Sequence, residues 1–244
     1  MSKNLKEELI QSLIDQKEIF GDVLFEENII KNRKTEIVKN ADVMQDSLFK
    51  EDWELAENLK DLNRLICKCQ KCPLGETRNK FVFGTGNPNA DAMCIGEGPG
   101  ADEDAQGLPF VGRAGRLLTD ILKAIKFERE EVYIANVIKC RPPGNRTPLP
   151  IEMDTCLPYL KKQIELIKPK VILCLGLTAA QGLLKKRDSL TNMRGNVFDF
   201  DSDGIKTKVM VTYHPAALLR NPNWKRGCWE DVQEFKKLYD ELTN

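Results

Sequence analysis

Four short apolar runs, separated by segments with helical periodicity, constrain the fold of this chain most strongly. The runs cover residues 91–96, 132–138, 170–176 and 208–214. Helical patterns lie between and after them, over 114–126, 151–167, 177–186 and 226–242. Strands that alternate with helices form βαβ units, in which a parallel sheet is covered on both faces. We therefore expect a three-layer α/β/α sandwich around a mainly parallel four-stranded sheet, with a hairpin around 196–208 leading into the last strand.

The stretch 95–118 begins at the end of the first apolar run and ends in a helical pattern. Glycine allows positive φ and a close approach of backbone to ligand. The turn combines three glycines, a proline and four carboxylates: Gly96, Gly98, Gly100, Pro99, Glu97, Asp102, Glu103 and Asp104. Phe110 follows in a segment that suggests an exposed ring. Open α/β sheets bind ligands at the carboxyl ends of their strands, so this turn is a candidate ligand site.

Two further polar residues stand at strand ends. Asn136 interrupts the apolar run YIANVIKC, where an unpaired amide would cost about 1–3 kcal/mol. Its amide either satisfies the backbone or binds a flat heterocycle, because it offers a donor beside an acceptor. His214, the only histidine, follows the last strand and is either a structural residue or part of a site. The loops after both residues leave the same sheet edge as the glycine-rich turn, so we expect all three to converge.

Eight cysteines without a signal peptide indicate reduced thiols rather than structural disulfides. Cys69, Cys72, Cys140 and Cys156 form two pairs that suit either tetrahedral zinc or a [4Fe–4S] cluster. The fifteen residues between the second pair favour a cluster over a zinc ribbon, although four unrelated buried cysteines remain an alternative. Cys67 is a possible alternative ligand. The remaining cysteines include two in strand runs, which we assign to packing: Cys94 and Cys174.

Basic residues near these positions suit a phosphate backbone. The loop RPPGNRTPLP after Cys140 carries Arg141 and Arg146, and is either a rigid surface connection or a phosphate-contacting loop. The segment after His214 supplies Arg220, Lys225 and Arg226.

Charge and periodicity divide the chain near residue 66. Basic and acidic residues balance at 37 each, which argues against a strongly basic nucleic-acid binder. Residues 1–66 hold 10 basic and 15 acidic side chains, so residues 67–244 are mildly basic. We expect 1–66 to be a partly disordered acidic extension with helices at Leu5–Leu13 and Trp53–Ile66 and a polar linker around 31–45. No apolar run approaches eighteen residues and the N-terminus has no signal-peptide pattern, so we expect a soluble, intracellular protein.

Taken together, the motifs resemble those of the family 4, iron–sulfur type, uracil-DNA glycosylases. The matching segments run from Cys67 to the C-terminus: Cys69-x2-Cys-Pro-Leu, GEGPGADEDAQGLPFVGRAGRLL, NVIKCRPPGNRTP, Cys156, LGLTAA and HPAALLRNP. The resemblance implies the uracil-DNA glycosylase fold over 67–244 and a monofunctional hydrolase. It would flip uracil out of single- or double-stranded DNA and leave an abasic site for base-excision repair.

The resemblance also implies roles for individual residues. A structural [4Fe–4S] cluster would be held by Cys69, Cys72, Cys140 and Cys156. Phe110 would stack on the uracil, Asn136 would read its Watson–Crick edge and His214 would lie by O2, with Glu97 and Gly98 lining the pocket. The HPAALLR loop, with Leu218, would wedge the duplex open, and Arg141, Arg146, Arg220 and Lys225 would contact DNA. We expect a monomer whose N-terminal extension is available to a protein partner.

One departure concerns the attacking water. Other enzymes of the superfamily carry an aspartate where this chain has Gly98, so Glu103 or Asp104 must be considered, and we hypothesise that Glu103 positions the water. A related subclass that bonds covalently to DNA uses a histidine in a basic insertion, which is absent here, so ordinary hydrolysis is expected. Two alternatives stay open: a catalytically silent nucleic-acid clamp, for example an accessory to a polymerase, and a zinc-bearing α/β protein unrelated to DNA.

Overall fold

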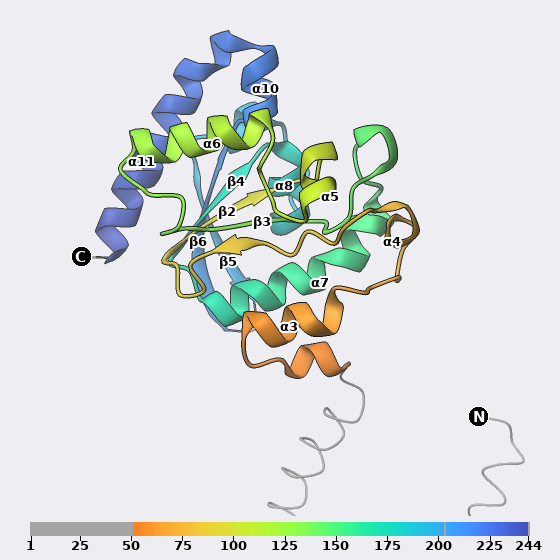
Figure 1. Cartoon of the computed structure of the whole chain (residues 1–244). Helices are drawn as coiled ribbons and strands as arrows, with labels where there is room; N and C mark the ends of the chain where they lie inside the picture. Colours follow the sequence, from red (N-terminus) through yellow and green to blue (C-terminus); the bar gives the residue numbers. More distant parts are fainter. Residues whose placement is uncertain (1–50, 203, 244) are drawn as a thin grey trace, which may run out of the picture. The chain divides into compact units, whose positions relative to one another are not determined.

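A six-stranded mixed sheet forms the centre of the computed structural model (Figure 1). The strand order is β1-β3-β2-β4-β6-β5, and the four central strands are parallel: β3 (Tyr133–Asn136), β2 (Ala92–Gly96), β4 (Val171–Leu175) and β6 (Ile205–Thr212). The predicted parallel sheet is therefore confirmed. Antiparallel strands β1 (Thr85–Gly86) and β5 (Val197–Ser202) extend it at the two edges, and β5 forms the expected hairpin with β6.

Helices cover both faces of the sheet, as the fold class requires (Figure 1). Side chains of a strand alternate between faces; in β2, Met93 and Ile95 enter one core cluster and Ala92 and Cys94 the other. The first cluster includes residues of α3 (Leu59–Ile66), α7 (Pro150–Ile167) and α8 (Leu177–Leu184). The second includes residues of α6 (Arg113–Ala124), α10 (Pro215–Arg220) and α11 (Lys225–Thr243). Cys94 and Cys174 are fully buried in these clusters, which confirms their assignment to packing.

Short helical segments lie between these elements, and most were not predicted. Their bounds are α4 (Leu74–Thr77), α5 (Ala101–Gln106), η3 (Pro143–Asn145), α9 (Leu190–Met193) and η4 (Pro222–Trp224).

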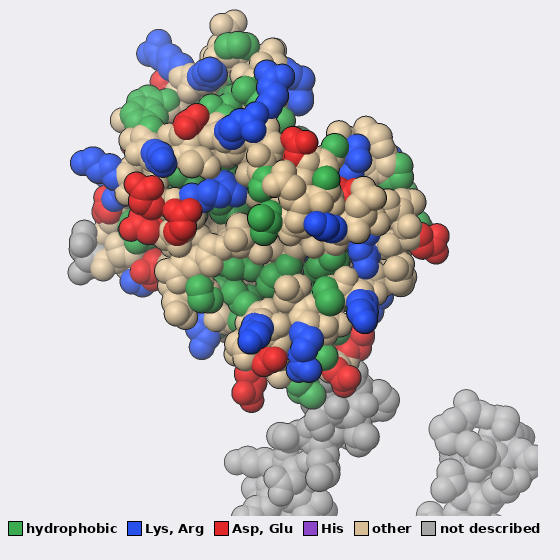
Figure 2. All heavy atoms as spheres, viewed as in Figure 1, with side chains coloured by type: hydrophobic (Ala, Val, Ile, Leu, Met, Phe, Trp, Pro, Cys, Tyr) green, Lys and Arg blue, Asp and Glu red, His purple; other side chains and the backbone are tan. Residues whose placement is uncertain are grey.

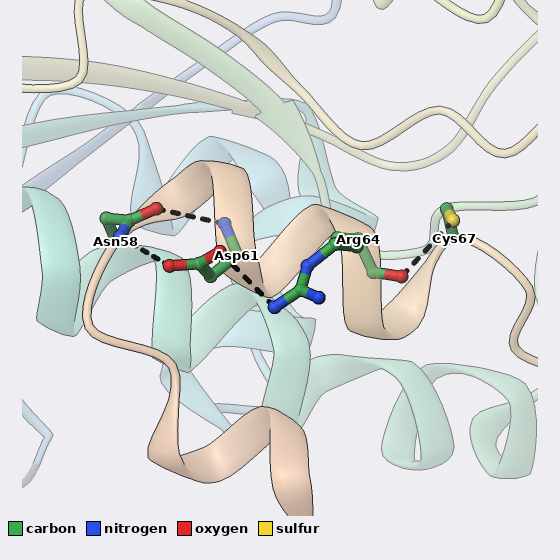
Figure 3. Close-up of polar contacts among 4 residues, drawn as sticks. All are labelled: Asn58, Asp61, Arg64 and Cys67. Atoms are coloured by element: carbon green, nitrogen blue, oxygen red, sulfur yellow. Dashed lines mark hydrogen bonds and ion pairs between the residues drawn. The ribbon is translucent and has the colours of Figure 1, made fainter.

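The helix expected over 53–66 is interrupted. A short 3-10 turn, η2 (Asp52–Leu55), is followed by a break and then by α3. Asn58 causes the break because its side chain caps α3: Oδ1 accepts the Asp61 N–H at 2.9 Å, while Nδ2 donates to the Asp61 carboxylate at 2.7 Å (Figure 3). Leu62 and Ile66 of α3 are nevertheless buried in the first core cluster.

The structure describes residues 51–202 and 204–243. The helix and linker expected within residues 1–50 lie outside this part of the chain, and the domain boundary near residue 66 stays a prediction. Within the described ranges, no helix is long and apolar enough to cross a membrane.

Candidate functional site

A cavity of about 410 Å³ lies at the carboxyl ends of the central strands. It is lined by residues that follow β2, β3 and β6, namely Glu97, Gly98, Pro99, Gly100, Glu103, Phe110, Asn136, Arg146, His214 and Arg220, among others. The expected convergence of the three loops is thus confirmed. A more open hollow of about 640 Å³ lies between the end of α6 and α11 and contains none of the predicted site residues.

Phe110 is buried rather than exposed, so this sequence expectation was wrong. Only 6% of the residue is accessible, its backbone is left-handed with φ of 53°, and its ring centroid lies 5.5 Å from that of His214. The loop folds inward because two glycines leave room for it. A Cβ on Gly96 would lie 2.6 Å from the Phe110 ring, and one on Gly115 would lie 1.8 Å from the Phe110 carbonyl oxygen. The ring therefore forms a wall of the cavity.

Asn136 presents an unpartnered acceptor to this cavity. The residue is 2% exposed, and its Oδ1 is buried without a hydrogen-bond partner. Leaving such an oxygen unsatisfied costs about 1–3 kcal/mol. The alternative in which this oxygen satisfies the backbone is therefore not what the structure contains, and a ligand N–H would complete the site.

His214 is held as a neutral imidazole. Its Nδ1 accepts the Ala216 N–H at 3.1 Å, at the start of α10, so the ring proton belongs on Nε2. Burial and, to a lesser extent, the charge of Arg220 together lower the pKa of His214 to about 4, against a small opposing effect of Glu103. At neutral pH the ring can therefore donate a hydrogen bond through Nε2 but carries no charge.

Glu103 is committed to the backbone of its own loop. Oε1 accepts the N–H groups of Val111 and Gly112 at 2.9 and 3.1 Å, and Oε2 accepts the N–H of Gly100 at 3.1 Å. Asp104 is similarly engaged, with the Asn79 amide and backbone as donors. These contacts give both carboxylates a structural role, and they remove the motivation for Glu103 as the water-positioning group.

The Glu103→Gln variant should therefore lose stability. The amide would turn one donor towards backbone N–H donors, so we expect the free energy of unfolding to fall by about 1–3 kcal/mol. Urea denaturation followed by circular dichroism measures this loss. Asp120→Asn, at an exposed position of α6, is the matched control and should be neutral. Equal stability of the two variants would contradict the structural role.

The predicted DNA-contacting residues fall into different classes. Arg146 is fixed by Glu152 through two bonds of 2.8 and 2.6 Å, and Arg141 donates to Asn145 at 2.7 Å. Arg220 and Lys225 are exposed, and Arg220 lines the cavity. Leu218 is 1% exposed and packs in the second core cluster, so its assignment to DNA contact is corrected: a side chain with no accessible surface cannot enter a duplex.

Three of the four predicted ligand cysteines accept hydrogen bonds at sulfur: Cys69, Cys140 and Cys156. The backbone N–H of Lys71 and the Tyr159 hydroxyl donate to Cys69 Sγ at 3.5 and 3.3 Å. Arg78 donates to Cys140 Sγ, and the Lys139 N–H to Cys156 Sγ, both at 3.3 Å. Donors of this kind stabilise ligating thiolates.

The pKa of Cys140 responds to the charges of nearby groups, including two of the other cysteines. Burial raises the pKa of Cys140, Arg78 lowers it, and the neighbouring Cys72 and Cys69 raise it again. Within residues 51–202 and 204–243, no three His, Cys, Asp or Glu side chains are grouped tightly enough for a single metal ion. Four cysteine thiols are a donor set that a [4Fe–4S] cluster takes, with each thiolate on a different iron, and that tetrahedral zinc also takes.

Cys67 stands apart from this set. Its thiol lies 3.6 Å from the carbonyl oxygen of Arg64 in the last turn of α3 (Figure 3). Sequence reasoning missed two other residues near the cysteines, Arg78 and the buried Lys139, although a lysine at the end of an apolar run was a visible signal.

Comparisons with known proteins agree with this geometry. The family model of the uracil DNA glycosylase superfamily matches residues 83–242. This range contains the α/β sheet and the cavity at its strand ends. The chain is 45% identical to the type-4 uracil-DNA glycosylase of Archaeoglobus fulgidus over 186 residues, covering 75% of this chain and 92% of that protein. It is 44% identical to that of Thermotoga maritima, covering 75% and 95%. The chain belongs to the type-4 uracil-DNA glycosylase family.

Proposed function

We propose that this protein hydrolyses the N-glycosidic bond of uracil in DNA, releasing free uracil and leaving an abasic site for base-excision repair. The observation that carries the proposal is the unpartnered Oδ1 of Asn136, buried in a cavity that Phe110 and His214 also line. Family membership supports the same activity. The silent-clamp alternative is not favoured, because a clamp has no use for an acceptor that is kept buried and unpaired.

Base recognition follows from the donor and acceptor pattern of Asn136. Its Oδ1 would accept from uracil N3–H and its Nδ2 would donate to O4, whereas cytosine presents the opposite pattern. A site built to pair these groups rejects the wrong base strongly, because mismatched polar groups stay buried and unpaired. The Phe110 ring would stack on the flipped base, and Glu97 and Gly98 would form the cavity wall.

Cleavage requires stabilisation of the departing uracil anion. His214, neutral with Nε2–H free to donate, would hydrogen-bond O2 together with backbone N–H groups of the glycine-rich turn. Gly98 has no space for a side chain, since a Cβ there would lie 2.6 Å from Ile138. Among the described carboxylates that line the cavity, Glu97 alone has no backbone N–H bonded to its side chain. We therefore assign the attacking water to Glu97.

The activity is tested with labelled oligonucleotides that contain one uracil, as single strands and as duplexes. Alkali after incubation should cleave the strand at the uracil position, and matched oligonucleotides with cytosine or thymine there should stay intact. Intact uracil strands on both substrates would refute the proposal.

The pH dependence should reflect a neutral His214. Its pKa of about 4 lies below the ordinary value, so the ring takes up its second proton only as the pH falls towards 4. That proton would go to Nδ1 and displace the Ala216 N–H. Because the fold favours the neutral form, this contribution to stability is present above the ordinary pKa and is lost as pH falls towards 4. We expect the single-turnover rate constant to show no inflection from His214 between about pH 5 and pH 8. An inflection near pH 6.5 that disappears in His214→Gln would contradict a neutral histidine.

The DNA face is proposed to lie over α10 and the start of α11, where Figure 2 shows gathered Lys and Arg side chains. Arg141, Arg220 and Lys225 would contact phosphates, and Arg146 would shape the loop that carries Arg141. Leu219, 38% exposed beside the buried Leu218, replaces Leu218 as the wedge.

The two neighbouring leucines should respond differently to alanine. Leu219→Ala should slow excision from duplex DNA about tenfold, because prying bases apart costs a few kcal/mol, and should leave single-strand excision nearly unchanged. Leu218→Ala should instead lower the free energy of unfolding by about 2–5 kcal/mol. Single-turnover assays and denaturation curves separate these effects, and a duplex defect confined to Leu218→Ala would restore the original assignment.

The cofactor proposed for Cys69, Cys72, Cys140 and Cys156 is a [4Fe–4S] cluster with a structural role. When bound, it would cross-link the segment before α4 to the loop after β3 and to α7. We further propose that the protein acts as a monomer inside the cell, and that its N-terminal extension is available to a protein partner.

A further inference from the structure

Lys139 is fully buried, with 0% of the residue accessible. Its Nζ donates to the backbone oxygen of Asn136 at 2.9 Å and to Gln163 Oε1 at 2.6 Å. None of the ion pairs in the described part of the chain joins it to a carboxylate. Burying an ammonium without a counter-charge is strongly unfavourable, so another group must compensate this charge.

The proposed ligand thiolates would supply this counter-charge, because they flank Lys139. The residue directly precedes Cys140, and its backbone N–H donates to Cys156 Sγ at 3.3 Å. Four thiolates around a [4Fe–4S] cluster leave a net negative charge, which a buried lysine neutralises without exposing the cluster to solvent.

The Lys139 ammonium also contacts Asn136, the residue proposed to read the base. Lys139 holds the carbonyl of Asn136, the residue whose Oδ1 is left unpaired for a ligand. Gln163 is itself fixed, because its Nε2 donates to the Phe83 carbonyl at 3.0 Å and contacts the Tyr133 hydroxyl at 3.3 Å. The ammonium is therefore held between a fixed amide and the carbonyl oxygen at the end of β3.

We infer that Lys139 is a positioning residue that links the two halves of the site: its charge stabilises the cluster, and its hydrogen bond to Asn136 sets the geometry of base recognition. The inference rests on the proposed activity and cofactor. It gives the cluster a defined effect on recognition of the base through one side chain, without any redox chemistry.

The test uses Lys139→Met in the full-length, cluster-loaded protein. Methionine keeps an unbranched apolar stem of four atoms but removes the ammonium, and with it the charge and all three donors. We expect the single-turnover rate constant on uracil DNA to fall about tenfold to a hundredfold, as small misplacements of a reacting group do. We also expect a chelator to bleach the cluster absorption about tenfold faster than in the unmodified protein, because an outer-shell partner of the cluster is lost.

Lys162→Met is the matched control. Lys162 is a neighbouring lysine on α7 whose side chain is 11% exposed, but it pairs with Glu165 and contacts neither Asn136 nor the cysteines. Both of its rates should equal those of the unmodified protein. If Lys139→Met does not fold, Lys139→Gln keeps a donor without the charge. The cluster of Lys139→Gln should bleach as fast as is expected for Lys139→Met. Its rate of uracil excision should be higher than that expected for Lys139→Met.

The outcomes are distinct. Loss of both properties in Lys139→Met, with Lys162→Met normal, supports the inference. Normal excision or normal bleaching in Lys139→Met overturns it. An unmodified protein that lacks activity contradicts the proposed function, and one that lacks iron contradicts the proposed cofactor, whereas an active, iron-bearing protein with an unaffected Lys139→Met contradicts this inference alone.

Discussion

Replacing Asn136 by alanine should abolish most uracil excision without weakening the fold. The side-chain oxygen has no partner in the described structure, so its removal relieves a desolvation cost of about 1–3 kcal/mol rather than breaking a bond. The base, in contrast, loses both of its edge contacts. We expect the single-turnover rate constant to fall roughly a thousandfold, while the free energy of unfolding stays equal or rises.

Asn79→Ala is the control, because it should lose stability while keeping its uracil-excision activity. Its amide donates to Asp104 at 2.6 Å, so its removal should cost stability, by about 1 kcal/mol. Chemical denaturation and oligonucleotide cleavage on the same preparations separate the two variants. If Asn136→Ala were as active as the unmodified protein, the base-reading assignment would fail. If the variant were strongly destabilised, Asn136 Oδ1 would have a hydrogen-bond partner in solution.

Replacing Cys140 by serine should remove the proposed cluster and much of the stability that it would confer. Metal binding energy in such sites contributes directly to folding energy, so we expect several kcal/mol to be lost. The protein should also lack the broad absorption at about 400 nm that is expected of an iron–sulfur cluster. Iron and sulfide content per chain, absorption and thermal unfolding measure these effects.

Cys67→Ser tests whether the ligand set is specific. The Cys67 thiol donates to the carbonyl of Arg64, and Arg78, which bonds Cys140 Sγ, contacts only the backbone oxygen of Cys67. We expect unchanged iron content and absorption. A colourless Cys67→Ser protein, or a fully loaded Cys140→Ser protein, would mean that the ligands have been assigned wrongly.

The sequence predicted the layers of the fold because they depend on local patterns. Apolar runs and helical periodicity are properties of neighbouring residues, so the parallel strands and the large helices were found. The break before α3 was missed, since the apolar spacing continues across it and only the capping role of Asn58 interrupts the helix. The phase of the six-residue helix α10 was also misjudged, because so short a helix does not show which of Leu218 and Leu219 faces the core.

The sequence predicted which residues line the candidate site, but not how deeply they are buried or which groups they contact. Phe110 was expected to be exposed because nothing near it in sequence reveals that Gly96 and Gly115 make room for an inward loop. Glu103 belongs to an acidic cluster that suggested catalysis, whereas its backbone partners lie up to nine residues away. Lys139 was overlooked for the same reason: Gln163, which accepts from it, is on another element.

The two outer strands limit how this sheet can associate with other chains. Exposed sheet edges recruit further strands and seed aggregation unless they are short or charged. Here β1 has only two residues, and β5 carries Asp199 and Asp201 on its solvent side, with Asp199 paired to Lys208 at 2.6 Å. A strand from another molecule would find too few backbone groups to pair with at β1. At β5 it would have to desolvate two carboxylates. Both edges therefore disfavour aggregation through the sheet.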